Sequence, residues 1–308
     1  MTINRVCGSG LQAIVSAGRQ VALGESDIVL AGGIENMDQA PFVLPKARYG
    51  YRMGVTAENV AEKYGVSRDE ADEYSLRSHQ RASEAIQTGA FAEQIVPVEI
   101  RQKKHTITFT RDEHVRANAT AEGFARLAPV FKKDGSVTAG NSSGINDGAA
   151  FMLVTRRQTA DQRGLPVAGR LVSYAVAGVD PAYMGMGMVP ATRKALERAG
   201  LTIDDVDLFE VNEAFASIAV ACGRELGIPG GQAQPARWRH CPGAPDWRKR
   251  GRADRQAAAR TRASHRSLDQ PGCTPATSEA ASTASRWSPP CATSGGGSAD
   301  RSSSSGTG

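Results

Sequence analysis

Cys7 is the residue with the clearest potential for covalent chemistry. It lies in the segment Cys7-Gly8-Ser9-Gly10, which is followed by apolar residues at helical spacing up to Gly24. We therefore expect Cys7 at the N-terminus of a helix, where the helix dipole and free backbone amides favour a thiolate. The glycines would allow a sharp turn into the helix and the close approach of a substrate carbonyl. A catalytic nucleophile and a buried structural cysteine both fit this local pattern.

Two further segments place polar groups where a ligand could bind. Asn212 lies between an expected strand at 207–210 and an expected helix at 213–226. There it could orient a water molecule or donate toward an oxyanion, or it could cap the helix. Residues 140–148 form a loop rich in glycine and asparagine, whose amides could bind a polar ligand or belong to a complex turn. The loop lacks the lysine of a P-loop, which argues against a nucleotide phosphate cradle.

Metal, disulfide and membrane chemistry are not indicated. None of the five histidines stands at metal-ligand spacing from another histidine, a cysteine or an acid. Five scattered cysteines without paired spacing fit a reducing cytoplasm. No apolar run of about 18 residues predicts a membrane span, and no signal peptide is visible after Met1. We therefore expect a cytoplasmic protein with no metal and no membrane association.

Strands and helices alternate along the first 229 residues. Strands are expected at 27–31, 95–100, 149–155, 171–179 and 207–210, and helices at 11–24, 67–89, 190–200 and 213–226. The helix at 67–89 opens on a capping box, with Ser67 as N-cap and Glu70 three residues later. Residues 41–66 contain prolines and glycines and are expected to be irregular. The alternation predicts an α/β layer structure.

The net charge of +5 is unevenly distributed. Residues 230–308 hold eleven Arg and one Lys against five acidic residues, a net +7, and the preceding residues are therefore at −2. The same segment has no Ile, Val, Met, Phe or Tyr and a single Leu, so it cannot bury enough apolar surface to fold. Nucleic-acid binding through this basic segment is the less favoured interpretation, and we expect no nucleic-acid partner.

Four segments resemble signatures of the thiolase family, the acetyl-CoA acetyltransferases and 3-ketoacyl-CoA thiolases. They are residues 4–13 around Cys7, then 31–37, 137–150 and 212–216, in the family's order, and the resemblance covers residues 2–229. It implies that Cys7 occupies the family's nucleophile position. It also implies a thiolase-like layered αβαβα fold of the α/β class, incomplete in this chain, with a loop domain inserted in the first of two similar halves.

The resemblance divides the chain into five parts. They are a remnant of the N-terminal half with the nucleophile (1–41), a shortened loop domain (42–138), the last strand region of the N-terminal half (139–160), the start of the C-terminal half (161–229), and an aberrant, disordered tail (230–308).

The resemblance implies ping-pong acyl transfer with coenzyme A as a substrate and with no cofactor. The Cys7 thiolate would take an acyl group from a 3-ketoacyl-CoA and pass it to CoA, while Asn212 holds a water molecule in an oxyanion hole. The expected substrate contacts are Arg116 at the nucleotide, Ser143 at the pantetheine arm, and Ala214, Phe215, Phe131, Met184 and Met53 at the pocket. The implied partners are acyl-CoA and CoA, in a homodimer or homotetramer.

The chain departs from the family pattern in three places. Six residues precede Cys7, where the family has the first strands of its sheet. Residues 49–60 fuse two similar family segments at Met53, and Arg52 stands where the family has a histidine. After Asn212, the Gly-His-Pro motif and the Cys-x-Gly-Gly-Gly motif are absent in recognisable form. We therefore expect an impaired or inactive thiolase, the alternative being a non-catalytic acyl-CoA-binding protein.

A one-nucleotide insertion or deletion near residue 230 would explain the third departure. Codons for residues 238–251, read from the second base, are compatible with a segment that contains Gly-His-Pro. A shifted GC-rich gene would also give a tail rich in Arg, Ala, Pro and Ser. Sequencing the locus tests this hypothesis, which fails if the shifted frame does not encode Gly-His-Pro.

Overall fold

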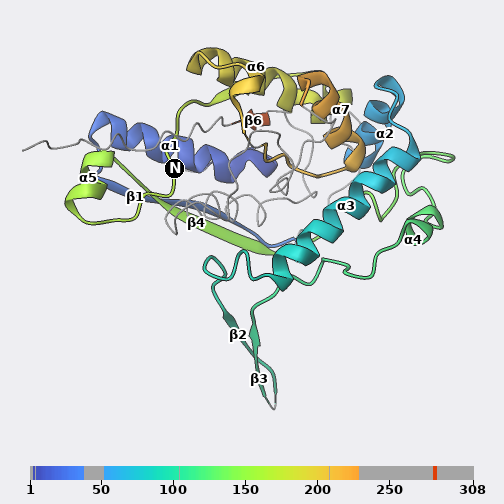
Figure 1. The fold of residues 1–308 in the computed structure, drawn as a ribbon, viewed down its shortest axis with the longest axis horizontal. Helices are drawn as coiled ribbons and strands as arrows, with labels where there is room; N and C mark the ends of the chain where they lie inside the picture. The colour runs from blue at the N-terminus through green and yellow to red at the C-terminus, as the bar shows by residue number, and fades with distance from the viewer. Residues whose placement is uncertain are drawn as a thin grey trace, which may run out of the picture.

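The computed structural model describes residues 3, 5–37, 52–103, 105–207 and 209–228, together with the backbone of 280–282 (Figure 1). In chain order the elements are η1 (Val6–Gly8), α1 (Ser9–Leu23), β1 (Ile28–Glu35), α2 (Met53–Lys63), α3 (Arg68–Gln87), β2 (Val98–Arg101), β3 (Thr106–Phe109), α4 (Ala121–Ala125), β4 (Gly148–Thr155), α5 (Arg157–Gln162), β5 (Ala175–Ala177), η2 (Pro181–Gly187), α6 (Met188–Ala199), η3 (Ile203–Asp205), α7 (Ala216–Leu226) and β6 (Ala280–Ser282). The mixture of helices and strands agrees with the expected α/β class.

The first layer consists of α1 on the antiparallel pair β1–β4. The pairing runs from Ile28 opposite Thr155 to Glu35 opposite Gly148, and α1 packs against both strands (Figure 1). The helix ends at Gly24, whose φ of 79° gives the left-handed conformation that glycine adopts at helix ends. The strands predicted at 27–31 and 149–155 and the helix predicted at 11–24 are therefore confirmed, and the helix starts two residues earlier than expected.

The opposite face of the β1–β4 pair is apolar and exposed. Leu30 lies opposite Leu153, Gly32 opposite Phe151, and Ile34 opposite Ala149, so these side chains share one face. Leu30, Ile34, Phe151 and Leu153 are each more than half exposed. This surface is called the apolar ribbon face below.

The main core lies where α7 packs against α2, α3 and η2. Residues 216–223 of α7 are all buried, because its small side chains let neighbouring elements approach from several sides. Tyr74 of α3, Val60 of α2 and Ile218 of α7 are among the largest fully buried side chains. The core therefore fixes the N-terminal end of α7 against two long helices.

Residues 41–66 contain a helix, contrary to the expected irregular segment. The helix α2 covers Met53–Lys63, and it buries Ala57, Val60 and Ala61 at helical spacing on its core side. The prolines that suggested an irregular chain stand at 41 and 45, outside the described residues. The expected helix at 67–89 is confirmed as α3, and its capping box is present, with the Ser67 hydroxyl accepting from the Glu70 amide.

The later elements follow the predictions less closely. The expected helix at 190–200 is confirmed as α6, and Pro190 lies in its first turn, where the missing amide hydrogen costs nothing. The expected strand at 95–100 is observed as β2, which starts three residues later, ends one residue later and pairs with β3 in a hairpin. The expected strand at 171–179 is reduced to β5, which pairs with β6 of the tail. The rest of the tail lies outside the described residues.

The prediction of a strand at 207–210 was wrong at residues 207, 209 and 210, which are the residues of this range that the structure describes. Residues 207, 209 and 210 have no strand assignment. The expected helix at 213–226 starts only at Ala216, because Phe215 is extended and forms an isolated β-bridge with Ser142. Tertiary pairing therefore delays the start of α7 by three residues and leaves Asn212 in a loop.

Candidate active site

Cys7 lies in the 3-10 turn η1 immediately before α1. The turn is closed by the Gly8 amide donating to the Arg5 carbonyl at 3.0 Å and by the Arg5 amide donating to the Ser9 hydroxyl at 2.8 Å. Val6 has a φ of 55°, which for a β-branched residue costs roughly 1–3 kcal/mol and is typical of functional turns. Cys7 is partly buried. The predicted position of Cys7 at a helix N-terminus is confirmed.

Asn212 is partly buried in the loop before α7. Its side-chain oxygen Oδ1 is buried and accepts no hydrogen bond from the described residues. The N-cap of α7 is Phe215, and no side chain caps that helix, so the interpretation of Asn212 as a helix cap was wrong. An unsatisfied buried amide oxygen costs about 1–3 kcal/mol, which a water molecule or a ligand that donates to it would recover.

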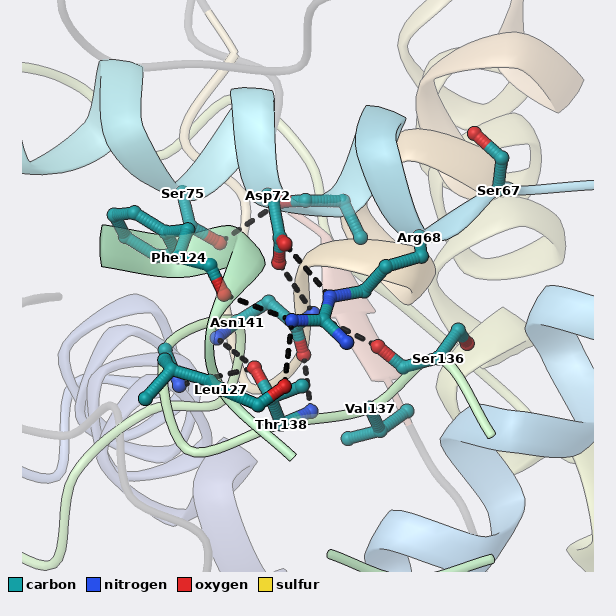
Figure 2. Close-up of polar contacts among 12 residues, drawn as sticks. Ser67, Arg68, Asp72, Ser75, Phe124, Leu127, Ser136, Val137, Thr138 and Asn141 are labelled. Carbon is teal, nitrogen blue, oxygen red and sulfur yellow. Dashed lines mark hydrogen bonds and ion pairs between the residues drawn. The ribbon is translucent and has the colours of Figure 1, made fainter. Parts of the chain in front are cut away.

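Hydrogen bonds within residues 138–142 fold the first half of the glycine- and asparagine-rich loop into a turn (Figure 2). The Thr138 amide donates to Asn141 Oδ1 at 2.8 Å, and the Gly140 amide donates to Thr138 Oγ1 at 3.2 Å. The Ser142 hydroxyl donates to the Thr138 carbonyl at 2.6 Å. Residues 138–143 therefore form the complex turn that was one of the two interpretations, and not a cradle of free amides.

This turn is joined to the segment that carries Asn212. The amide and the hydroxyl of Ser143 both donate to the Ala214 carbonyl, at 3.0 and 3.1 Å. Phe215 is 3% exposed, and its ring meets that of Phe131 edge to face with centroids 6.2 Å apart. Four residues predicted to contact substrate, Ser143, Ala214, Phe215 and Phe131, are thus brought together.

Met53 belongs to the same cluster, whereas Met184 does not. Met53 opens α2 and packs, partly buried, against the core that contains Phe215. Met184 lies in η2, where Tyr183 and Met186 join that core and the Met184 side chain does not. The structure therefore brings together the pocket residues predicted on α2 and near α7, and it leaves Met184 at their margin.

Arg116 is exposed in the segment between β3 and α4, next to the loop of Ser143. Its amide donates to His79 Nδ1 at 3.3 Å, and the His79 and His114 rings lie 5.9 Å apart. His114 packs on Gly144 so closely that a Cβ at Gly144 would stand 2.6 Å from the imidazole. Sequence reasoning missed the two histidines, because residues 35 positions apart with no shared motif give no spacing signal.

The histidine pair should make stability depend on pH. Burial, followed by the charges of His114 and Arg116, lowers the pKa of His79, and burial and Arg116 lower the pKa of His114. The unfolded chain then binds protons more readily than the folded chain, so stability falls as the pH drops below about 6.5. We expect the thermal midpoint of unfolding to be lower at about pH 5.5 than at about pH 7.5. This decrease should be smaller in the double variant H79Q/H114Q.

The matched control for this measurement is His105→Gln, because His105 is exposed in the turn of the β2–β3 hairpin. We expect this variant to keep the pH dependence of the unchanged chain. If H79Q/H114Q shows the full pH dependence, the assignment to this pair is wrong.

Two partly or fully buried carboxylates also support the site and were assigned no role from the sequence. Glu58 accepts from the amides of Ser136 and Val137, both at 2.9 Å. Glu213 accepts from the hydroxyls of Tyr74 and Ser78, at 3.1 and 2.6 Å. Single acidic residues carry no sequence signal for burial, since their partners come from distant segments.

Neither a metal cluster nor a membrane span is found in the described parts of the chain. Within them, no three His, Cys, Asp or Glu side chains gather in a way that could hold a metal ion. No helix there is long and apolar enough to cross a bilayer.

Comparison with known proteins matches consecutive parts of the chain to the two domains of one family. The family model "Thiolase, N-terminal domain" matches residues 1–52 and 43–158, and "Thiolase, C-terminal domain" matches residues 165–234. An acetyl-CoA acetyltransferase of Syntrophomonas wolfei is 50% identical over 251 residues, which cover 73% of this chain and 63% of the relative. The beta-ketothiolase BktB of Cupriavidus necator is 49% identical over 258 residues, which cover 76% of this chain and 66% of the relative. The chain thus spans somewhat less than two thirds of these relatives.

Solved structures agree with the sequence matches. The Bacillus anthracis acetyl-CoA acetyltransferase has a TM-score of 0.72 at 39% identity, covering 85% of this chain and 70% of its own. Human mitochondrial 3-ketoacyl-CoA thiolase in complex with CoA has a TM-score of 0.67 at 40% identity, and the match covers 74% of this chain and 62% of the thiolase chain. The expected thiolase-like α/β fold is confirmed by these neighbours. Matches to both family domains, in chain order and together covering more than half of the residues, show that this chain belongs to the thiolase family.

Proposed function

We propose that this chain performs thiolase-type acyl transfer between 3-ketoacyl-CoA and CoA through an acyl-cysteine at Cys7. The observation that carries the proposal is the position of Cys7 in a strained turn directly before the fifteen-residue helix α1. The positive end of the helix dipole favours a thiolate there. The matched relatives are named acetyl-CoA acetyltransferases and a beta-ketothiolase, and one solved neighbour is described in complex with CoA.

The first half-reaction follows from this placement. The Cys7 thiolate attacks the carbonyl carbon of acetyl-CoA, the oxygen gains negative charge, and the bond to the CoA sulfur breaks to release the CoA thiolate. One thioester replaces another, so the step is nearly balanced in energy. The buried Oδ1 of Asn212 would accept a hydrogen from a water molecule, whose second hydrogen is then free to donate to the developing oxyanion.

The substrate contacts belong to the same proposal. Ser143 would contact the pantetheine arm, and Arg116 the nucleotide. Ala214, Phe215, Phe131 and Met53 would line the acyl pocket, with Met184 at its margin. The assembly that we propose from the family is a homodimer or homotetramer.

We further propose that turnover by this chain is impaired. After Asn212 the sequence has neither the Gly-His-Pro motif nor the Cys-x-Gly-Gly-Gly motif in recognisable form. In the family, the histidine of the first motif activates the nucleophile and the cysteine of the second acts as acid and base, and the sequence identifies no counterpart of either. Losing one member of such a catalytic unit lowers rates by several orders of magnitude.

The test is to incubate the purified chain with acetyl-CoA and then with acetoacetyl-CoA and CoA. We expect slow, single-site acetylation in the intact mass, and turnover at least about 1000-fold below the usual 10 per second of enzymes. The Syntrophomonas wolfei relative, assayed in parallel, is the positive control. Turnover equal to that control would refute the impairment, and complete absence of acetylation would refute acyl transfer.

The alternative is a non-catalytic protein that binds acyl-CoA. The ordered contact of Ser143 with Ala214 favours it, because a binding surface of this kind needs no activated thiol. Calorimetric titration with CoA separates the two functions. Binding without any acetylation of Cys7 would support the alternative, and acetylation would support acyl transfer.

A further inference from the structure

Asn141 is a buried polar residue at a junction between α3, the 136–143 turn and the start of α7. It is 4% exposed, and its side-chain amide is fully used (Figure 2). Oδ1 accepts from the Thr138 amide at 2.8 Å, while Nδ2 donates to Asp72 Oδ1 at 2.8 Å and to the Ser136 carbonyl at 2.9 Å. One amide group therefore fixes the turn internally and ties it to α3.

Asp72 determines which way this amide faces. A carboxylate accepts hydrogen bonds only, so the NH2 group of Asn141 must point at Asp72 and the oxygen must point at the Thr138 amide. Asp72 is itself held by Arg68, whose Nε lies 2.6 Å from Asp72 Oδ2. Nη2 of Arg68 donates to the carbonyls of Phe124 and Leu127, at 2.8 and 2.9 Å. The relay Arg68–Asp72–Asn141 thus joins α3, α4 and the turn.

The backbone of the same turn holds the segment that carries Asn212. The Asn141 carbonyl accepts from the Ala216 amide at 3.0 Å, and the Ser143 amide donates to the Ala214 carbonyl at 3.0 Å. Since Asn212 is two residues before Ala214, moving the turn moves the Asn212 loop with it. Displacements of about 1 Å can cost about 100-fold in rate where reacting groups must be aligned.

We infer that Asn141, oriented by Asp72 and Arg68, is a positioning residue that fixes the Asn212 loop and Ser143 for acyl transfer. This inference rests on the function proposed above. It assigns no substrate contact to the relay, because the side chains of Asn141 and Asp72 are buried and engaged with protein partners. Its effect passes through the hydrogen bonds between residues 141–143 and 214–216.

The variant Asn141→Asp tests the relay with almost no change in shape. It replaces the donor that faces Asp72 and the Ser136 carbonyl by an oxygen, so two acceptors meet and repel. In the double variant D72N/N141D, Asn at 72 can accept from Arg68 and donate to Asp at 141. The Ser136 carbonyl then lacks its donor, so we expect partial recovery. Glu73→Gln is the control, since it removes the negative charge from the Arg77–Glu73 pair on the same helix and leaves an oxygen that can accept from Arg77.

Three measurements separate positioning from general stability. The first is the initial rate of Cys7 acetylation by acetyl-CoA, which we expect N141D to lower about 10-fold or more and D72N/N141D to restore in part. The second is alkylation of Cys7 by iodoacetamide, which we expect to change less than about twofold because it needs no aligned oxyanion group. The third is hydrogen exchange of peptides that cover residues 141–143 and 214–216, which N141D should accelerate selectively.

The outcomes are distinguishable from failure of the proposed function. If the unchanged chain is not acetylated, acyl transfer fails, and hydrogen exchange still decides whether Asn141 holds the Asn212 loop. Unchanged exchange at 214–216 in N141D, or a uniform increase over the whole core, would overturn the inference. The inference would also be overturned if N141D exchanged hydrogen faster at residues 214–216 but was acetylated at a rate within twofold of the unchanged chain. If N141D does not melt cooperatively, D72N alone is used with the same measurements.

Discussion

Replacing Cys7 by alanine is expected to abolish acetylation of the chain by acetyl-CoA, with a loss of at least about 100-fold in incorporated radiolabel. Alanine removes the sulfur that we propose as nucleophile and leaves the turn and the helix N-terminus in place. The substitution should not impair folding, because Cys7 is partly exposed and lies outside the main core. Labelling with radioactive acetyl-CoA followed by peptide mapping measures the effect.

Cys222→Ala is the matched control for this experiment. Cys222 is 1% exposed in α7, and burial raises the pKa of its thiol to about 12, so it remains protonated at neutral pH. We expect this variant to be acetylated as fast as the unchanged chain. Peptide mapping must also cover Cys241, Cys273 and Cys291, which lie outside the described residues. Equal labelling of the Cys7→Ala chain at any of these sites would contradict Cys7 as the acyl carrier.

Replacing Glu58 by alanine should cause a large loss of stability. Glu58 is 4% exposed and accepts from the amides of Ser136 and Val137 and from the Ser136 hydroxyl. Without it two backbone amides lose their acceptor in the interior, at about 1–3 kcal/mol each. We therefore expect the free energy of unfolding to fall by roughly 2–5 kcal/mol, measured by urea denaturation.

Glu62→Ala is the control, because Glu62 lies one turn further along the same helix. Its side chain is 72% exposed and pairs with Lys132 on the surface, where an ion pair contributes little. We expect the urea midpoint of this variant to stay close to that of the unchanged chain. Equal destabilisation by both substitutions would show that helix propensity, and not the buried acceptor, accounts for the loss.

Local signals in the sequence predicted local structure well. The Ser67–Glu70 capping box is present as expected, because its hydrogen bonds involve residues three apart and need no tertiary partner. The position of Cys7 before α1 followed from the same kind of signal. The helix α2 was missed, because the prolines at 41 and 45 and the glycines among residues 41–66 indicated an irregular segment.

Structure that depends on distant partners was not predictable in the same way. The interpretation of Asn212 as a helix cap failed because Phe215 pairs with Ser142, 73 residues earlier, and shifts the helix start. The relay from Arg68 to Asn141 likewise joins residues that share no motif. Sequence motifs therefore identified the family and several site residues, whereas the supporting hydrogen bonds required the folded chain.

The apolar ribbon face has a consequence for handling the protein. One face of the β1–β4 pair exposes apolar side chains to water, namely those of Leu30, Ile34, Phe151 and Leu153. Surfaces of this kind adsorb to hydrophobic resins, bind detergents and drive colloidal clustering as salt concentration rises. Preparations of this chain should therefore be kept dilute and at low ionic strength, because ammonium sulfate strengthens the association of exposed apolar surfaces.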